Sequence, residues 1–318
     1  MTVYTYFIGI DIGKEQFVVA CHHHKIVKTY DNTSSGIALF LQEFKDDLPK
    51  SLCVLETTGG YEMLLLFTLC KYDYNVHRAN TRKVKNFIRS FGDKAKTDAL
   101  DAKHLALYGF ERSAHLSCFV PGSSVAIQLF HLGQRRQDLK SMLVQEKNRS
   151  KSPHDCLMVK KSCASMIVTL EAQINEITAE INDLISNDPV LSEKKKILKG
   201  IPGIGDVVAN NLLSFLPELG TLNRKEIAAL AGVAPKANES GKFVGYRSTG
   251  HGRAHIKPIL FVSAMAARNS HSPLKMYYEQ LIGRGKKKMV ALTALMRKII
   301  VIANARIKEY LGGIAQRT

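Results

Sequence analysis

Three short segments near the start of the chain have the hydrophobic pattern of β-strands. Residues 6–11 form an apolar run that ends in a carboxylate, residues 16–21 form a second β-rich run, and residues 25–30 alternate in polarity. Helical and strand-like runs then alternate at 37–44, 52–55, 61–70 and 75–77. Strands followed by alternating helices and strands are typical of an α/β fold with a mixed sheet.

The middle of the chain has helical periodicity. Residues 124–148 carry apolar side chains at helical spacing, and a second run, bounded by Asn187-Asp188-Pro189, has them in steps of four and three: Cys163, Ile167, Leu170, Ile174, Ile177, Ile181 and Leu184. A seam of about three heptads fits a coiled coil that joins protomers. It fits equally a helical hairpin that folds back within one chain, so the pattern leaves both structures open.

Helical periodicity continues from residue 190 but is interrupted by glycine. A glycine-rich, basic stretch occupies residues 235–254, and apolar helical runs return at 256–268 and 289–307. We therefore predict three parts, which are an α/β domain at 1–115, a helical linker or coiled coil at 116–189 and a basic, mainly α domain at 190–318.

The net charge of +17 is concentrated at the C-terminal end. Residues 1–110 hold 14 Lys and Arg against 12 Asp and Glu, residues 111–189 hold 9 against 9, and residues 190–318 hold 22 against 7. A basic domain suits a polyanionic partner because each neutralised phosphate releases condensed counterions. Charge alone does not separate DNA from RNA or from an acidic lipid surface, and a merely solvated surface is the plainer alternative.

The chain lacks the sequence features of a membrane or secreted protein. No apolar stretch approaches the length of a membrane span, and the N-terminus lacks a basic-then-apolar signal pattern. None of the six cysteines forms a CxxC pair, so neither a zinc ribbon nor a redox motif is indicated. We expect a cytoplasmic protein whose thiols are reduced.

Four acidic residues lie where predicted elements begin or end. Asp11 and Glu56 each follow an apolar strand, and the ends of adjacent strands face one crevice. Thr97 is placed to cap a helix on which Asp98 and Asp101, three residues apart, share one face. Each carboxylate taken alone is ordinary. Together the four would repel strongly unless divalent cations joined them, and Mg²⁺ prefers such oxygen ligands.

Three motifs carry a resemblance to a known family. The segments GIDIGKE, LETTGGYE and KTDALDA resemble the DEDD transposases of a bacterial insertion-sequence family, which also includes the Piv-type pilin-gene DNA invertases. GIDIG alone is shared with sugar kinases and actin-like ATPases, whereas KTDALDA is far more specific. The resemblance implies an N-terminal domain with the ribonuclease H-like fold of the RuvC resolvase. It also implies catalytic residues that hold Mg²⁺ or Mn²⁺ at Asp11, Glu56, Asp98 and Asp101.

A glycine-rich segment, KGIPGIG, runs from Lys199 to Gly205 ahead of an apolar helical run. Its glycines permit a tight turn before a helix whose free N–H groups can hold a phosphate. We expect a helix-hairpin-helix-like element in which Lys199, Gly203 and Gly205 contact nucleic acid. A plain corner between two helices favours the same Gly-Pro-Gly sequence and is the alternative.

Ser240 lies in the basic, glycine-rich stretch. By its chemistry alone it is a turn serine that bonds local backbone. The resemblance includes a PxxxxSG-type segment of the family's C-terminal transposase domain, and it places the family's nucleophilic serine on Ser240. A transient phosphoserine link to DNA would store the phosphodiester energy for rejoining. Ser248 and Thr249 are rival nucleophiles. The cations expected to neutralise the phosphate are Lys242, Arg247 and Arg253.

These features together predict a DNA transposase or site-specific recombinase of a bacterial insertion sequence. The resemblance implies double-stranded donor and target DNA, a structured guide RNA in some members, association with the nucleoid, and a homo-oligomer, dimer or tetramer, that brings the carboxylates and Ser240 together. A Holliday-junction-type metal nuclease without a covalent intermediate is the main alternative. A non-catalytic DNA- or RNA-binding regulator would not need the acidic positions and Ser240 intact. An ATPase or sugar kinase would need a second acidic-glycine phosphate loop, for which the sequence has no convincing candidate.

Overall fold

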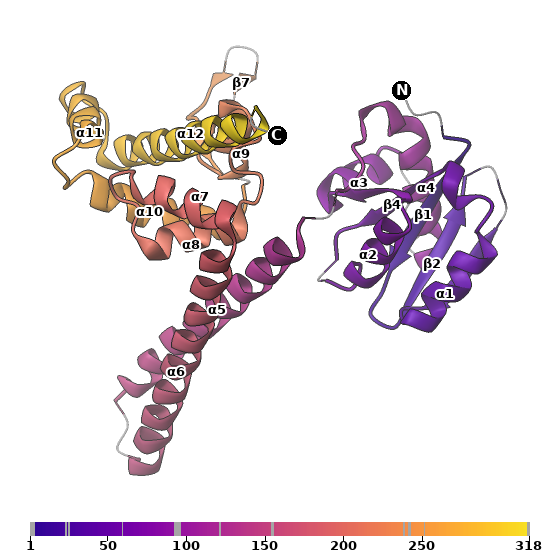
Figure 1. Cartoon of the computed structure of the whole chain (residues 1–318), viewed down its shortest axis with the longest axis horizontal. Helices are drawn as coiled ribbons and strands as arrows, with labels where there is room; N and C mark the ends of the chain where they lie inside the picture. Colours follow the sequence, from indigo (N-terminus) through magenta and orange to yellow (C-terminus); the bar gives the residue numbers. More distant parts are fainter. Residues whose placement is uncertain are drawn as a thin grey trace. The chain divides into compact units, whose positions relative to one another are not determined.

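The chain forms two compact units, Met1–Pro121 and Gly122–Thr318, and Figure 1 colours them along the sequence. The computed structural model describes residues 4–22, 24, 26–58, 60–91, 97–120, 122–153, 156–237, 239–240, 243–250 and 252–316. The helices of the predicted middle segment belong to the second unit.

The first unit is built on one five-stranded mixed sheet in the order β3-β2-β1-β4-β5, which confirms the predicted sheet. Strands β1, β2 and β3 pair in antiparallel fashion, whereas β4 and β5 extend the sheet in parallel. Apolar side chains fill most of β1 and β4 because the sheet is covered on both faces. The strands are β1 Tyr6–Ile12, β2 Gln16–Cys21, β3 Val27–Asp31, β4 Ser51–Glu56 and β5 Asn75–Ala79.

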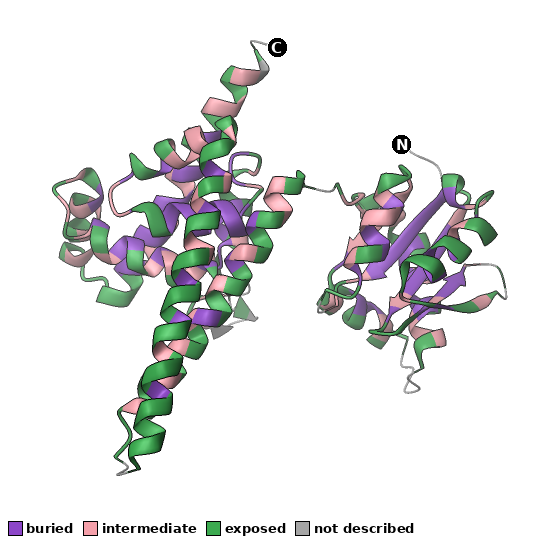
Figure 2. Cartoon of the chain, turned by 60° about the horizontal axis from the view of Figure 1, so that its bottom comes forward, coloured by how far each residue is buried: buried purple, intermediate pink, exposed green. Residues whose placement is uncertain are grey.

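Helices cover the two faces of this sheet, and each face has its own core. On one face, apolar side chains of α1 and α2 pack against alternate residues of β1 such as Ile8 and Ile10. On the other, α3 and α4 pack against Phe7, Leu52 and Val54. The buried strands between exposed helical surfaces are visible in Figure 2. The helices are α1 Ser34–Glu43, η1 Leu48–Lys50, α2 Met63–Lys71, α3 Thr81–Arg89, α4 Asp98–Arg112 and η2 Ser113–His115.

A glycine on β1 lets α4 lie directly against the sheet. A Cβ atom at Gly9 would stand 2.0 Å from the carbonyl oxygen of Ala102 and 2.2 Å from the amide nitrogen of Ala106. Farther along the helix, a Cβ at Gly109 would stand 2.8 Å from Val54. These contacts are with backbone or buried side chains, so the glycine at position 9 determines where the helix sits.

In the second unit, α5 (Ser124–Ser150) and α6 (Leu157–Asn187) pack against each other as a helical hairpin within the chain. The predicted seam of α6 faces this contact: Leu170 and Ile174 are buried together with Leu139 of α5. Of the two alternatives for the heptad pattern, the structure has the intrachain hairpin. A coiled coil between protomers stays a prediction.

The C-terminal part of the second unit is mainly helical, as predicted. One apolar core joins its helices to the base of the hairpin through Leu129, Ile181 and Ile185. No helix in the described ranges is both long and apolar enough to cross a membrane. The elements are α7 Pro189–Lys199, α8 Asp206–Phe215, α9 Arg224–Leu230, β6 Pro235–Lys236, β7 Glu239–Ser240, β8 Phe243–Val244, β9 Ser248–Thr249, α10 Ile256–Ala267, α11 Pro273–Gly283 and α12 Lys288–Ala315.

Candidate active site

Asp11 and Glu56 lie at the same edge of the sheet. The parallel register of β1 and β4 pairs Ile10 with Leu55, so the next residue on each strand is one of the two carboxylates. Both side chains are partly buried. Residues paired across adjacent parallel strands project from the same face, and this face is the one that α4 covers.

The first turn of α4 carries the other two carboxylates. Thr97 caps the helix, since its hydroxyl accepts a hydrogen bond of 3.3 Å from Leu100 N, and this confirms the predicted cap. Asp98 and Asp101 follow in that turn, where the helix dipole favours negative charge. Gly9 lies against Ala102, so Asp11, two residues farther along the strand, faces the turn that holds both aspartates.

The other three carboxylates influence Asp11 electrostatically. The pKa of Asp11 is raised from 3.8 to about 6, first by burial and then by the negative charges of Asp101, Asp98 and Glu56. Every one of the three predicted partners therefore acts on Asp11. A cation placed among these groups would relieve the repulsion.

The chemistry of this donor set fits a hard divalent cation, because carboxylates supply only oxygen ligands. Within the described ranges, no three His, Cys, Asp or Glu side chains lie close enough together to hold one metal ion. Mg²⁺ does not require such a cage, since it keeps several waters and is commonly held by one or two carboxylates plus substrate phosphates. One or two of the four carboxylates would be enough to meet this requirement.

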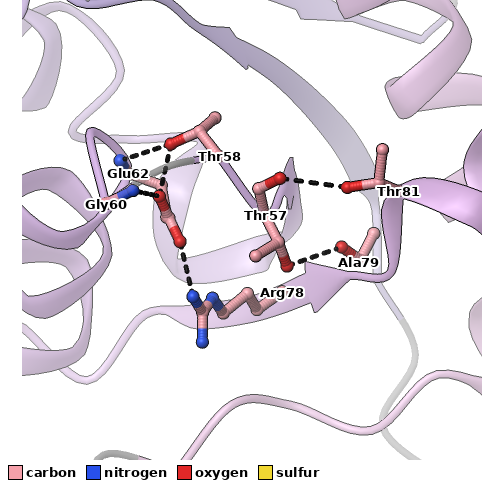
Figure 3. A network of polar contacts seen from close by, with 7 residues as sticks. All are labelled: Thr57, Thr58, Gly60, Glu62, Arg78, Ala79 and Thr81. Atoms are coloured by element: carbon pink, nitrogen blue, oxygen red, sulfur yellow. Dashed lines mark hydrogen bonds and ion pairs between the residues drawn. The ribbon is translucent and has the colours of Figure 1, made fainter. Parts of the chain in front are cut away.

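A buried network beside Glu56 was not anticipated from the sequence. Glu62 is fully buried, and its carboxylate accepts hydrogen bonds from Thr58 Oγ1, from Gly60 N at 3.1 Å and from Arg78 Nη2 at 2.5 Å. Figure 3 shows these contacts. Burial pushes the pKa of Glu62 upward, but the bonds from Thr58 and Arg78 outweigh it, so the pKa lies below its usual value. The available sequence signal was the second Glu of LETTGGYE, which follows two glycines.

This network holds the loop that leaves β4 directly after Glu56. Thr57 Oγ1 donates to Ala79 O at 3.1 Å, and Thr81 Oγ1 donates to Thr57 O at 3.0 Å, so the loop is tied to the end of β5. Asn32 adds a link to β1, because its side-chain amide donates to Gly13 O and Tyr61 O at 3.1 and 3.0 Å. The loops at the carboxylate edge are thus fixed by several hydrogen bonds.

Ser240 lies in the second unit, at the end of the two-residue strand β7. Its backbone pairs in antiparallel fashion with Phe243 of β8. The predicted contact Lys242 lies outside the described residues. Among the rival nucleophiles, Ser248 is exposed, whereas Thr249 accepts a hydrogen bond of 3.1 Å from Lys257 Nζ.

The other predicted cations of the second unit have carboxylate partners. Lys199 pairs with Asp206 at 2.9 Å, and Arg247 pairs with Glu239 at 3.1 Å; both pairs are exposed. Arg253 is different: it makes a bidentate pair with Glu218 and donates to Phe215 O at 2.5 Å. Exposed pairs contribute little and can be exchanged for a phosphate, whereas Arg253 ties its loop to the end of α8.

The glycines between α7 and α8 have separate roles. Gly203 has a φ of +90°, and a Cβ there would stand 2.3 Å from Ser263 O, so it permits a turn packed on α10. Gly205 is exposed and is the N-cap residue of α8. Asp206 occupies the first turn of α8, and its pKa is lowered chiefly by the hydrogen bond from Lys199. A phosphate at this helix end would have to compete with that carboxylate.

Comparisons with known proteins match both units. Residues 8–156 match a DEDD-type family model described as "Transposase", and residues 195–279 match one described as "Transposase IS116/IS110/IS902 family". The first match spans the four carboxylates, and the second spans Ser240.

Similar individual proteins include both full-length and partial matches. The pilin gene-inverting proteins of Moraxella lacunata and Moraxella bovis are each 27% identical over 312 residues, which cover 95% of this chain and 96% of theirs. A 43.6 kDa protein of insertion element IS110 from Streptomyces coelicolor is 29% identical over 155 residues, 48% of this chain and 37% of its own length.

Proposed function

From its membership of the IS116/IS110/IS902 family of transposases, we propose that the chain cuts and rejoins DNA through a phosphoserine intermediate. A divalent cation held by the carboxylates assists this reaction. Cutting and rejoining of DNA is the activity of this class of enzyme. The observation that supports the metal part is the raised pKa of Asp11, to which Asp101, Asp98 and Glu56 all contribute.

The carboxylates have the role of organising the scissile phosphate. Asp11 and Glu56 stand on two neighbouring strands of a covered sheet, and Asp98 and Asp101 stand on a capped helix, so all four are held by regular structure. Mg²⁺ or Mn²⁺ bound there would stabilise the charge that develops on the attacking and leaving oxygens. The Glu62 network keeps the loop after Glu56 in place and thereby orients that ligand.

In the proposed chemistry Ser240 attacks the scissile phosphate. The Ser240 Oγ–P bond forms while the bond from phosphorus to one deoxyribose oxygen breaks, and the serine proton ends on that leaving oxygen. The hydroxyl of another strand reverses the step by attacking the phosphoserine, so the strand is rejoined without loss of the phosphodiester energy. Support for Ser240 comes from the match of its segment to the family model.

The finer structural assignments belong to the same proposal. We retain a ribonuclease H-like fold for the first unit, supported by a sheet with three antiparallel strands followed by two parallel ones. We also retain a helix-hairpin-helix-like DNA contact at Lys199, Gly203 and Gly205, assembly as a homo-oligomer on donor and target DNA, and a structured guide RNA. The basic residues 190–318 supply the charge that either nucleic acid needs.

The proposal is tested by trapping a covalent protein–DNA adduct. Wild-type protein, Ser240→Ala and Asp11→Ala would be compared with Mg²⁺ on donor DNA that carries the element's own ends and flanks, with the neighbouring RNA supplied. We expect an adduct with wild type and none with either variant. Ser248→Ala and the exposed Asp46→Ala are matched controls that should keep the adduct.

Two results would contradict the mechanism. Cleavage that persists in Ser240→Ala without any adduct would leave the hydrolytic, junction-resolving nuclease as the function. An adduct that is lost in Ser248→Ala but kept in Ser240→Ala would move the nucleophile to the rival serine.

A further inference from the structure

The first unit contains a basic cleft that its average charge conceals. Four of the 14 Lys and Arg in residues 1–110 lie on the nine-residue helix α3, which has no acidic residue. The remaining ten are outnumbered by the 12 acidic residues of that segment. The buried side of α3 is apolar, with Val84 and Phe87 in the core, so its cations are confined to the exposed side.

A cleft of about 720 Å³ runs along α3 between β5, the C-terminal half of α4 and η2. Lys83, Asn86, Phe87 and Ser90 line it at spacings of three and four residues, so they form one face of the helix. Arg112 and His115 line the opposite side, and both are exposed. None of the described residues that line the cleft is acidic.

The cations of the cleft are positioned by their neighbours, and their charge is not neutralised by a carboxylate. The guanidinium of Arg112 stands 5.9 Å from the centre of the Phe87 ring, which orients it across the cleft. Within the described residues, neither Lys83 nor Arg112 has a carboxylate partner. The pKa of His77 in the same cleft is lowered by burial and by the charge of Lys83, so the cleft is positive without it.

The cleft is also connected to the carboxylate edge. Helix α3 begins at Thr81, whose hydroxyl donates to the carbonyl of Thr57, the residue next to Glu56. Arg78, which lines the cleft, holds the buried Glu62 of the same loop. A polyanion lying along α3 would therefore reach, at the start of that helix, the loop that follows Glu56.

We propose that this cleft binds the sugar–phosphate backbone of duplex DNA beside the cleavage point, with Lys83 and Arg112 each neutralising one phosphate. The proposal rests on the chain's action on DNA and not on the identity of its nucleophile. It adds a DNA contact on the unit whose net charge is close to neutral, separate from the basic residues 190–318. Contacts of this kind position a duplex without reading its sequence.

The test measures how DNA affinity depends on salt. Full-length protein would be titrated with a duplex of arbitrary sequence, in chelator so that no cleavage occurs, and log Kobs would be plotted against log salt concentration. The double variant Lys83→Gln with Arg112→Gln should reduce the slope by about 1.8, since each phosphate contact contributes about 0.9. Lys45→Gln with Lys71→Gln removes the same charge from exposed positions of the same unit outside the cleft and should leave the slope unchanged.

A charge-preserving variant and an RNA arm make the test decisive. Lys83→Arg with Arg112→Lys should keep the slope, and thermal unfolding of all variants shows whether each is folded. Equal slopes for the cleft and control double variants would overturn the proposal. A reduced slope with RNA but not with DNA would also overturn it, because the cleft would then be an RNA contact. Neither result touches adduct formation by Ser240, so the two proposals fail independently.

Discussion

The carboxylate edge of the first unit and the basic stretch 235–254 of the second illustrate two ways of building a functional region. The carboxylates stand on long, regular elements, and the position of α4 over the sheet is set by a backbone contact at Gly9. Ser240 stands on a strand of two residues, and the strands around it are equally short. The first region is preorganised by its core, whereas the second is held by local ion pairs such as Arg247–Glu239 and Arg253–Glu218.

The difference shows where like charges are held close together in the fold and where a charged side chain can exchange its partner. Asp11 is kept among other carboxylates at the expense of a raised pKa, which prepares the edge for a cation. In the second region Arg247 is in an exposed pair with Glu239 that a phosphate can replace. The metal binding and the DNA binding that we propose would thus draw on two kinds of electrostatics.

The strongest test of this contrast is a pair of glycine substitutions. Gly9→Ala puts a Cβ 2.0 Å from Ala102 O, so we expect the free energy of unfolding to fall by about 3 kcal/mol or more, with loss of cleavage as α4 moves. Gly250→Ala has no atom within 4 Å of the added Cβ and should change stability by about 0.5 kcal/mol or less. Chemical denaturation measures both. Similar changes in the free energy of unfolding for the two variants would contradict the contrast between the carboxylate edge and the basic stretch.

Glu62→Gln tests whether the buried network supports the carboxylate edge. The change removes the charge that pairs with Arg78, and we expect the free energy of unfolding to fall by about 2 kcal/mol. Because Glu56 would be less well oriented, we also expect cleavage to require a higher Mg²⁺ concentration. Glu171→Gln, which breaks the exposed pair with Lys147, is the matched control and should cost less than about 1 kcal/mol. Unchanged stability in Glu62→Gln would mean that the network does not hold the loop.

Arg253 and Arg247 separate structure from DNA contact within the basic stretch. Arg253→Gln loses the bidentate pair with Glu218 and should lower the free energy of unfolding by about 1.5 kcal/mol. Arg247→Gln should change stability by less than about 0.5 kcal/mol but reduce the salt slope of DNA binding by about 1. Denaturation and salt titration of both variants provide the measurements. A change in salt slope with Arg253→Gln and a loss of stability with Arg247→Gln would refute this division.

The smallest expected effect is a pH dependence at Asp11. Because its pKa is raised from 3.8 to about 6, the folded state holds the proton more tightly, and the free energy of unfolding without divalent cations falls as pH rises through that interval. Solvent screens part of this effect because Asp11 is only partly buried. Thermal unfolding in chelator should show the decline in wild type and in Asp46→Asn, and a weaker one in Asp11→Asn. Parallel profiles for all three would contradict the electrostatic account.

The sequence predicted those features that depend on neighbours along the chain. Alternating and continuous apolar runs predicted the mixed sheet, and Thr97 before Asp98 and Asp101 predicted the cap of α4. The heptad pattern predicted a buried seam but left its partner open, because a periodic apolar face is satisfied equally by the same chain or by another. The structure pairs it with α5.

By itself, the sequence determined the elements, the acidic residues at their ends and the excess of positive charge at the C-terminal end, because periodicity, capping and composition act over a few residues. Only the tertiary structure decided which charges meet. Glu62 finds Arg78 from the next strand, Arg253 finds Glu218 across 35 positions, and the cations of α3 face Arg112 across a cleft. The packing of the core brings these distant residues together. The sequence on either side of each residue does not indicate which partner it will have.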